Sequence, residues 1–513
     1  MSKTSNSNRR LAKNTLMLYV RMLFTLSISL YTSRVILSTL GVEDFGIYNV
    51  VGGVVAMLGF LTASLGSAAA RFISFSIGTE DKQSMKDTFS SLLLIHIILA
   101  SSIFFFGETI GLWFLENKMS IPVERELAAF WVYQCSIISS MLSVMYVPYN
   151  ASIIAHERMS VYAYFSIIDV SLKLVIVYLL SVIPFDKLVA YAVLLAAVHL
   201  FMQLFYITYC ITHFKETKMK PAFNKKIFNE VLSFTGWNTI GNLSTLANTQ
   251  GLNVLLNLFF GPAVNAARGI AVQVQGVVRS FVINFQVAVN PQITKSYAIS
   301  DTERLHQLIR LSSKFSFYLM LFLSLPLMLE AELVLKWWLG IVPDHTVAFL
   351  RLVLCSTLIY TLSNPLCVSV YASGRLKKYQ IADSIFMLSV LPLSYILLKY
   401  LGVDAEFVFV VHFVLDIMAH YVRLKIVMPL INMSMVDYFT TILTPIVKVI
   451  FVAPLIPLFI YSNINQNVYT FLFVCIICVI STITTFYFCG IDLSERIYVQ
   501  QKISYYLNKV TKK

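Results

Sequence analysis

The chain has 513 residues, of which 58% are hydrophobic and 13% are charged, and its mean hydropathy is +0.75. A composition this apolar excludes a soluble globular protein and predicts a chain that crosses a membrane many times. The net charge is +13, but the lysines and arginines follow the pattern of membrane topology, so no nucleic-acid partner is predicted.

Breaks in hydropathy at charged residues, glycines and prolines predict about fourteen transmembrane helices, and the expected fold class is an all-α integral membrane protein. In chain order these helices cover 12–39, 46–77, 88–115, 127–155, 160–183, 188–213, 228–259, 263–294, 308–339, 346–373, 379–400, 404–430, 436–461 and 468–490.

Lysines and arginines outside the predicted helices are distributed unevenly between the two sides. The termini and the even-numbered loops hold 25 of them, whereas the odd-numbered loops hold six. Short cytoplasmic loops carry an excess of Lys and Arg, so both termini are predicted to be cytoplasmic. The alternation also supports an even number of helices.

Two segments 217 residues apart resemble each other: PYNASIIAHERMSVY (148–162) and PLCVSVYASGRLKKY (365–379). The matched pairs are Pro148 with Pro365, Ser152 with Ser369, Ala155 with Ala372, Arg158 with Arg375 and Tyr162 with Tyr379. A similar offset of 220 matches Gly41 with Gly261. Because the copies are six helices apart, they are predicted to be parallel repeats.

The repeat predicts four parts. An N-lobe of six helices covers 1–214, a basic cytoplasmic linker covers 215–226, and a C-lobe of six helices covers 227–431. Two further helices and a basic tail fill 432–513. Two bundles around a central site are typical of alternating-access transporters.

Cations inside the apolar stretches indicate an interior surface for an anionic ligand. A charge at mid-bilayer costs about 3 kcal/mol on insertion scales, so such residues usually face a wet cavity or a partner. These residues are Arg21, Arg34, Arg71, Lys173, Arg279, Lys314, Arg351 and Lys448.

Polar residues at helical spacing identify candidate substrate-binding faces on three helices. The first helix carries Asn14, Arg21, Thr25 and Thr32; the seventh carries Asn238, Asn242, Thr245, Thr249 and Asn253; the eighth carries Arg268, Gln275, Arg279, Gln286 and Asn290. Such faces either line a cavity or form hydrogen bonds between helices. Arg71 is either a topology residue or a cation at the mouth of a cavity.

Acidic residues within the spans are candidates for ion coupling. Asp169 precedes Lys173 by four residues, which predicts a structural ion pair. Asp416 lies between His412 and His420 on one face of the twelfth helix. This face either carries protons or forms a structural cluster. The seven cysteines lack metal-ligand spacing, and no phosphate-binding loop, HExxH or GxSxG motif occurs, so no metal, cofactor or enzyme activity is predicted.

Three blocks of the sequence carry a resemblance to a known family. They are LGVEDFGIYNVVGGV (40–54), VPYNASIIAHERMSVYAYFSI (147–167) and GPAVNAARGIAVQV (261–274), the last followed by NPQITKSYA (290–298). They resemble the polysaccharide-transporter branch of the multidrug/oligosaccharidyl-lipid/polysaccharide exporter (MOP) superfamily, the Wzx-type flippases of Gram-negative bacteria. The resemblance runs through nearly the whole chain.

The resemblance implies a flippase that moves undecaprenyl-diphosphate-linked oligosaccharide, such as O-antigen in lipopolysaccharide synthesis, across the bacterial inner membrane. The implied partners are this lipid-linked glycan, membrane lipid and a glycan polymerase complex. Related peptidoglycan-precursor flippases use arginines on their first, second and eighth helices, where Arg21, Arg71 and Arg279 lie here.

Two other functions stay open. One is an ion-coupled drug exporter of the same superfamily; such exporters bind organic cations and commonly keep an acid on the first helix, whereas residues 1–42 contain none. The other is a scaffold for a glycan-assembly complex that transports nothing, which the sequence does not distinguish from a flippase.

Overall fold

The computed structural model describes residues 14–29, 31–32, 35–36, 39–40, 44, 47–48, 51, 59–118, 121–218, 223–339, 341–464, 467–492 and 496. Every regular element within these ranges is a helix, and 11 helices are long and apolar enough to cross a membrane. This confirms the predicted all-α membrane class. Each of the 11 helices matches a predicted span. In addition, α8 matches the span predicted at 228–259. The two remaining predicted spans, 12–39 and 46–77, lie partly outside the described residues.

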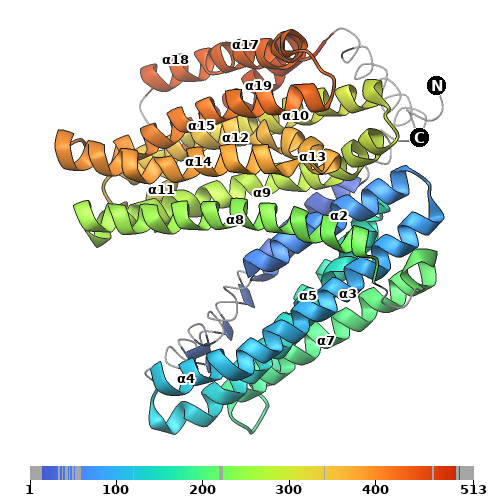
Figure 1. Cartoon of the computed structure of the whole chain (residues 1–513). Coiled ribbons are helices and arrows are strands. Elements are labelled where there is room, and N and C mark those ends of the chain that lie inside the picture. The colour runs from blue at the N-terminus through green and yellow to red at the C-terminus, as the bar shows by residue number, and fades with distance from the viewer. Residues whose placement is uncertain are drawn as a thin grey trace, which may run out of the picture. The chain divides into compact units, whose positions relative to one another are not determined.

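The chain divides into two compact units. Unit 1 comprises 1–243 and 287–301, and unit 2 comprises 244–286 and 302–513. Besides helical residues 14–29, the elements within unit 1 are α2 (Gly59–Gly78), α3 (Lys82–Phe106), η1 (Gly107–Gly111), α4 (Leu112–Lys118), η2 (Val123–Arg125), α5 (Glu126–Ala155), α6 (Met159–Leu180), α7 (Lys187–His213) and η3 (Lys215–Lys218). In this unit α5 packs against α2, α3 and α7 (Figure 1).

In unit 2, α15 packs against α12 and α14, and α10 packs against α12 and α19 (Figure 1). The elements within this unit are α10 (Thr302–Leu329), α11 (Ala331–Leu339), α12 (Thr346–Thr361), α13 (Ser363–Ser373), α14 (Leu376–Ile396), η4 (Leu397–Leu401), α15 (Glu406–Val427), η5 (Met428–Leu430), α16 (Met435–Tyr438), η6 (Phe439–Leu443), α17 (Thr444–Val452), α18 (Leu455–Asn463), α19 (Val468–Thr485) and η7 (Phe486–Gly490).

Two long helices, α8 (Lys225–Phe260) and α9 (Pro262–Ala298), belong to both units. Gly261 alone separates them, with a φ of +80° that residues with a Cβ rarely adopt. Pro291 inside α9 has no N–H to donate to the Val287 carbonyl, so the helical hydrogen-bond ladder is interrupted there. The interruption coincides with the point at which α9 passes from unit 2 into unit 1.

The two segments matched by the sequence repeat have the same local geometry. The Ser152 hydroxyl donates to the Pro148 carbonyl at 2.9 Å, and the Ser369 hydroxyl donates to the Pro365 carbonyl at 2.8 Å. The first bond lies in α5 and the second in α13. The repeat is therefore present in the hydrogen bonding of the chain and not in its letters alone.

The turns that follow these helices also agree. Glu157 and Gly374 both have a positive φ, 58° and 72°. Arg158 and Arg375 come next, with φ and ψ of −84° and 53° in the first turn and −95° and 59° in the second. The partner positions at the other offset, 220, cannot be compared because Gly41 lies outside the described residues.

The lobe boundaries at 214 and 227 stay a prediction. The compact units divide inside α8 and α9 instead, between Leu243 and Ser244 and between Gln286 and Val287. Hydropathy marks where a chain leaves the membrane, whereas the units reflect packing along two helices that are longer than a single span.

The C-terminal helices are attached to unit 2 by one face of α10. Side chains four residues apart on α10 bind the segment 437–492. The contacts are Arg310 to Asp437 at 2.7 and 2.9 Å, Lys314 to Asp492 at 3.4 Å, and the Tyr318 hydroxyl to the Gly490 carbonyl at 3.1 Å. Lys314, a predicted intramembrane cation, is fully buried and serves this attachment.

Candidate ligand-binding cavities

Several predicted site residues meet in a cavity of unit 2, which we call the arginine cavity. Its volume is about 250 Å³. It is lined by Thr245, Asn248, Thr249, Leu252, Arg268, Val272, Gln275, Arg279, Val353, Ser356, Thr357, Tyr360, Met387, Phe409, His412 and Asp416. Five helices contribute: α8, α9, α12, α14 and α15. The structure thus joins the polar face of α9 to the acid of α15.

Arg279 is the cation of this cavity with hydrogen-bond donors to spare. Its guanidinium carbon lies 4.7 Å from the centroid of the Tyr360 ring. Among the described residues it forms no hydrogen bond and no ion pair. An aromatic face attracts a cation without neutralising it. The guanidinium donors of Arg279 are therefore available to a ligand.

Arg268 is fixed to the neighbouring helix. One terminal nitrogen donates to the Asn253 side-chain oxygen, and the other donates to the Thr249 carbonyl at 3.2 Å. Both acceptors belong to α8, and the Arg268 side chain is almost fully buried. Arg268 supplies positive charge to the cavity, and both of its terminal nitrogens are already held by α8.

The acidic pair of the cavity is formed by two residues of α15. His412 Nδ1 lies 3.1 Å from Asp416 Oδ2. His420, predicted to share this face, lies instead near Tyr438, with its Nε2 3.5 Å from the Tyr438 hydroxyl. Within the described part of the chain, no hydrogen bond or ion pair joins His420 to Asp416. His420 therefore contacts Tyr438 of α16 rather than the acid.

The formal charge of the arginine cavity is positive. Arg268 and Arg279 contribute two positive charges and Asp416 one negative charge, whatever the state of His412. In a low-dielectric site an uncompensated guanidinium attracts an anion and repels a cation. Hydroxyl and amide groups of the walls add neutral hydrogen-bonding partners. Gln275, for example, donates to the Thr357 hydroxyl at 2.6 Å.

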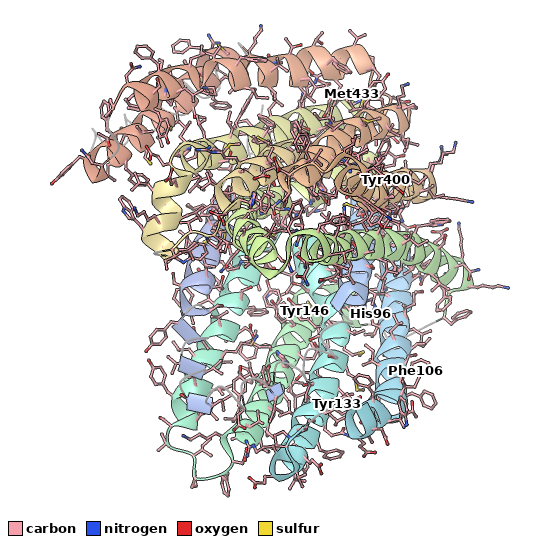
Figure 2. The ribbon with its side chains drawn as sticks, turned by 90° about the vertical axis from the view of Figure 1, so that its left-hand side faces the viewer. His96, Phe106, Tyr133, Tyr146, Tyr400 and Met433 are labelled. Carbon is pink, nitrogen blue, oxygen red and sulfur yellow. The ribbon has the colours of Figure 1, made fainter. Side chains whose placement is uncertain are left out.

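A second cavity, which we call the tyrosine cavity, lies in unit 1 and has a volume of about 290 Å³. It is lined by Leu142, Ser143, Tyr146, Phe165, Ser166, Asp169, Val170, Lys173, His199, Met202, Gln203 and Tyr206. Tyr146, labelled in Figure 2, comes from α5. Asp169 and Lys173 form the expected ion pair at 2.8 Å, so this cavity already contains a counter-ion for its acid.

Arg21 lies near the tyrosine cavity without lining it. Its guanidinium carbon is 4.6 Å from the centroid of the Tyr162 ring on α6. The structure therefore places Arg21 in unit 1 and Arg279 in unit 2, each over a tyrosine ring. Arg34 lies outside the described residues.

The polar face of α8 bonds to another helix in its unit 1 part. Asn238 donates to the Ser64 carbonyl at 3.3 Å, and Asn242 donates to the Ser64 hydroxyl at 2.8 Å. This is the interhelical hydrogen bonding that the sequence left open as an alternative. Neither residue lines the arginine cavity or the tyrosine cavity.

Three further predicted residues also lie outside both cavities. Gln286 bonds to the Ser316 hydroxyl at 3.0 Å and to the Thr361 carbonyl at 3.2 Å within unit 2. Asn290 belongs to the unit 1 part of α9. Arg71 has its guanidinium carbon 4.2 Å from the ring centroid of Phe72, its neighbour on α2. Gln286 thus bonds other helices, whereas the roles of Asn290 and Arg71 stay predictions.

Sequence reasoning missed the aromatic and hydroxyl walls of both cavities. Tyr360, Ser356 and Thr357 come from α12, and His199 and Gln203 come from α7. They lie in largely apolar stretches, so no polar stripe marks them. The one available signal was the presence of a histidine and a glutamine four residues apart inside the span predicted at 188–213.

No family model matches the sequence, and no curated protein matches it. Several solved structures are similar to this chain. An outward-facing multidrug resistance MATE family transporter of the MOP superfamily matches with a TM-score of 0.70 and 17% identity over 82% of this chain and 96% of that chain. A MATE in complex with MaD3S matches with a TM-score of 0.72 and 16% identity over 83% and 96%.

A third structure is a MOP superfamily transporter from Pyrococcus furiosus, described by the words "Reverse polarity of binding pocket suggests different function". It matches with a TM-score of 0.67 and 16% identity over 82% of this chain and 96% of that chain. Identities this low establish the fold and nothing finer. The chain is a multi-pass membrane protein with the fold of the MATE transporters of the MOP superfamily.

Proposed function

We propose that this protein is a flippase for an anionic, lipid-linked oligosaccharide in the bacterial inner membrane, and that the arginine cavity binds the diphosphate. The observation that carries the proposal is the positive charge of this cavity, with Arg279 free of any hydrogen bond to the described residues. The fold similarity to MATE transporters supports a membrane transporter. The sequence resemblance to Wzx-type flippases supports the substrate class.

A diphosphate suits this cavity for three reasons. A guanidinium binds phosphate oxygens with two parallel hydrogen bonds, and these charge-assisted bonds are about twice as strong as neutral ones. Arg268, held by α8, adds a second positive charge without needing to reorganise. The hydroxyl group of Ser356 offers a neutral partner for sugar or phosphate oxygens. The prenyl tail of such a substrate can stay in lipid.

Drug export is the second candidate, since two of the similar structures are multidrug or MATE transporters. An organic cation would have to enter a cavity in which two guanidiniums face one carboxylate, which costs free energy. The Pyrococcus furiosus transporter shows that a MOP-fold protein has been described with a pocket of reversed polarity. A transport measurement distinguishes a scaffold, which transports nothing, from both the flippase and the drug exporter.

The experiment compares Arg279→Lys and Arg279→Gln with wild type in proteoliposomes. The readout is transfer of a fluorescent undecaprenyl-diphosphate oligosaccharide between leaflets, followed by quenching from outside. We expect activity in the order Arg, Lys, Gln, with Gln at least tenfold slower, because one charge-assisted hydrogen bond contributes about 1.5–3 kcal/mol. Farnesyl diphosphate should inhibit wild type and farnesol should not.

Arg351→Gln is the matched control, because Arg351 lies in the same unit on α12 and bonds the Met328 carbonyl outside the cavity. It should flip the probe at the wild-type rate. Wild-type flipping by a stable Arg279→Gln protein would refute the diphosphate site. Absence of flipping by the wild-type protein would favour the scaffold.

A further inference from the structure

The turn between α5 and α6 holds a buried glutamate that binds the end of α9. Lys295 Nζ lies 2.8 Å from Glu157 Oε1, and the Gln292 amide donates to Oε2 at 3.4 Å. The Glu157 side chain is 8% exposed, against 21% for Lys295. The Asn14 amide donates to the backbone carbonyl of Glu157 at 3.1 Å. All four residues belong to unit 1.

The backbone at this position makes glutamate an unfavourable choice. Glu157 has a φ of 58°, in the left-handed region that favours glycine. The repeat-related turn has Gly374 at the same place, with a φ of 72°. One copy of the turn therefore keeps the residue that its backbone prefers, and the other carries a strained glutamate. Such a backbone outlier, at a side chain that is also buried and ion-paired, motivates a hypothesis of function.

The same end of α9 is closely packed on α2. A Cβ added at Gly78 would lie 3.0 Å from Lys295 Cα, from the Lys295 carbonyl oxygen and from Ala298 Cβ. The backbone of α9 thus approaches α2 as closely as a glycine permits. The ion pair and this contact hold the same two turns of α9, which follow the interruption at Pro291.

We propose that Glu157 and Lys295 form a latch that holds the end of α9 against α2 and the turn between α5 and α6, and that releases it during the transport cycle. Breaking the pair frees the segment after Pro291, which then leaves α2. The latch rests on the proposal that this protein is an alternating-access transporter. It does not depend on which substrate is carried.

The test measures exposure of the end of α9 without any substrate. Ser296 is 7% exposed and becomes the reporter as Ser296→Cys in the full chain, with the native cysteines replaced. Inside-out membrane vesicles are treated with an impermeant maleimide. Glu157→Gln, which keeps the shape and removes the charge, should raise the labelling rate on the order of tenfold. The exchanged pair Glu157→Lys with Lys295→Glu should restore the slow rate.

Glu80→Gln is the matched control. Glu80 also has a positive φ, 56°, but it is exposed and no ion pair of the described chain includes it. It should leave labelling unchanged. Gly78→Ala should accelerate labelling without altering any charge, because the added Cβ forces α9 off α2.

Two outcomes would overturn the latch. Unchanged labelling in a monodisperse Glu157→Gln protein would mean that the pair does not hold α9. Fast labelling that the exchanged pair fails to restore would mean that the carboxylate only supports its own turn. Lys295→Gln replaces Glu157→Gln should the latter not fold. The labelling readout uses no ligand and the Arg279 readout uses a lipid-linked probe, so failure of one proposal leaves the test of the other intact.

Discussion

At the scale of single residues, the charged groups at membrane depth differ in what already neutralises them. Lys173 is paired with Asp169, and Lys314 with Asp492. Arg268 is held by hydrogen bonds from α8, whereas Arg279 rests on a tyrosine ring. Sequence spacing could place Arg268 and Arg279 on one face, because both lie on one helix. It could not distinguish the occupied arginine from the available one, because that depends on Asn253 and Tyr360.

Ion coupling by the arginine cavity is testable at Asp416. If the His412–Asp416 pair exchanges a proton during transport, Asp416→Asn should abolish the dependence of flipping on a proton gradient. The reason is that an amide cannot take up or release a proton at physiological pH. The measurement is probe transfer in proteoliposomes with and without an imposed gradient.

Asp169→Asn is the comparison in the other unit, where Lys173 already neutralises the acid. A gradient dependence that survives in Asp416→Asn and disappears in Asp169→Asn would move ion coupling to the tyrosine cavity. A dependence that survives in both would leave both acids with structural roles.

Asp186 predicts a pH dependence of stability. This residue caps α7 and binds Arg125. Burial raises the pKa of Asp186, but hydrogen bonds from the Arg125 guanidinium and the Val189 N–H outweigh that effect and hold the pKa below its ordinary value of 3.8. Such a carboxylate stabilises the fold above about pH 4 and loses this contribution as pH falls through its lowered pKa.

Asp186→Asn should therefore lower the unfolding temperature at pH 7. Below pH 4 the difference in unfolding temperature between the variant and wild type should become smaller. The effect should stay under about 1 kcal/mol, because the pair is partly exposed. Unfolding temperatures in detergent from pH 3 to 7 measure it. Asp344→Asn, at an exposed site with no described ion pair, should run parallel to wild type at every pH. A constant deficit in Asp186→Asn across this range would contradict the assignment.

At the scale of helices, hydropathy located most spans within a few residues but could not see breaks inside them. The span predicted at 308–339 is two helices, α10 and α11, separated at Glu330. The span predicted at 346–373 is likewise α12 and α13, separated at Leu362. Apolar helices flank each break, and the few polar residues there (Glu330, Glu332, Ser363 and Asn364) do not divide the apolar stretch. The first break follows Pro326, which removes a helical hydrogen bond.

Docking of the last helices on α10 should be sensitive to volume at Gly490. A Cβ there would lie 2.9 Å from Tyr318 Cζ, so Gly490→Ala should destabilise the protein by about 1–3 kcal/mol through overpacking. Tyr318→Leu should lose a hydrogen bond and ring contacts on its own. In the double variant the clash disappears, so the double variant should lose less stability than the sum of the losses of the two single variants. Unfolding in detergent for all four proteins gives the coupling, and strict additivity would argue against this contact.

At the scale of the whole molecule, the sequence predicted an all-helical membrane protein and the local equivalence of its two halves. The apolar composition predicts the all-helical membrane protein, because so many apolar residues are stable only when they are removed from water in a bilayer. Five identical residues between 148–162 and 365–379 predict the local equivalence of the two halves. The matching hydrogen bonds and φ angles of these segments agree with that prediction. The division inside α8 and α9 escaped prediction because it follows packing along the helices, which leaves no trace in hydropathy.

Orientation in the membrane is predicted by loop charge and can be measured directly. Cysteines placed at 218 and 378 should be protected from an impermeant maleimide in intact spheroplasts, and cysteines at 118 and 343 should react. Lysing the cells should expose the first pair. Reaction at position 218 in intact spheroplasts would reverse the predicted orientation of the whole chain.

One helix, α9, carries both Arg279 and Lys295, about 24 Å apart at a rise of 1.5 Å per residue. The arm beyond the interruption, from Val287 to Ala298, is about 17 Å long by the same rise. A swing of this arm by about 15° would move its tip by about 4 Å, more than the 2.8 Å that separates Lys295 from Glu157. A small swing of this arm about Val287 would therefore be enough to separate Lys295 from Glu157, and both of these residues belong to unit 1.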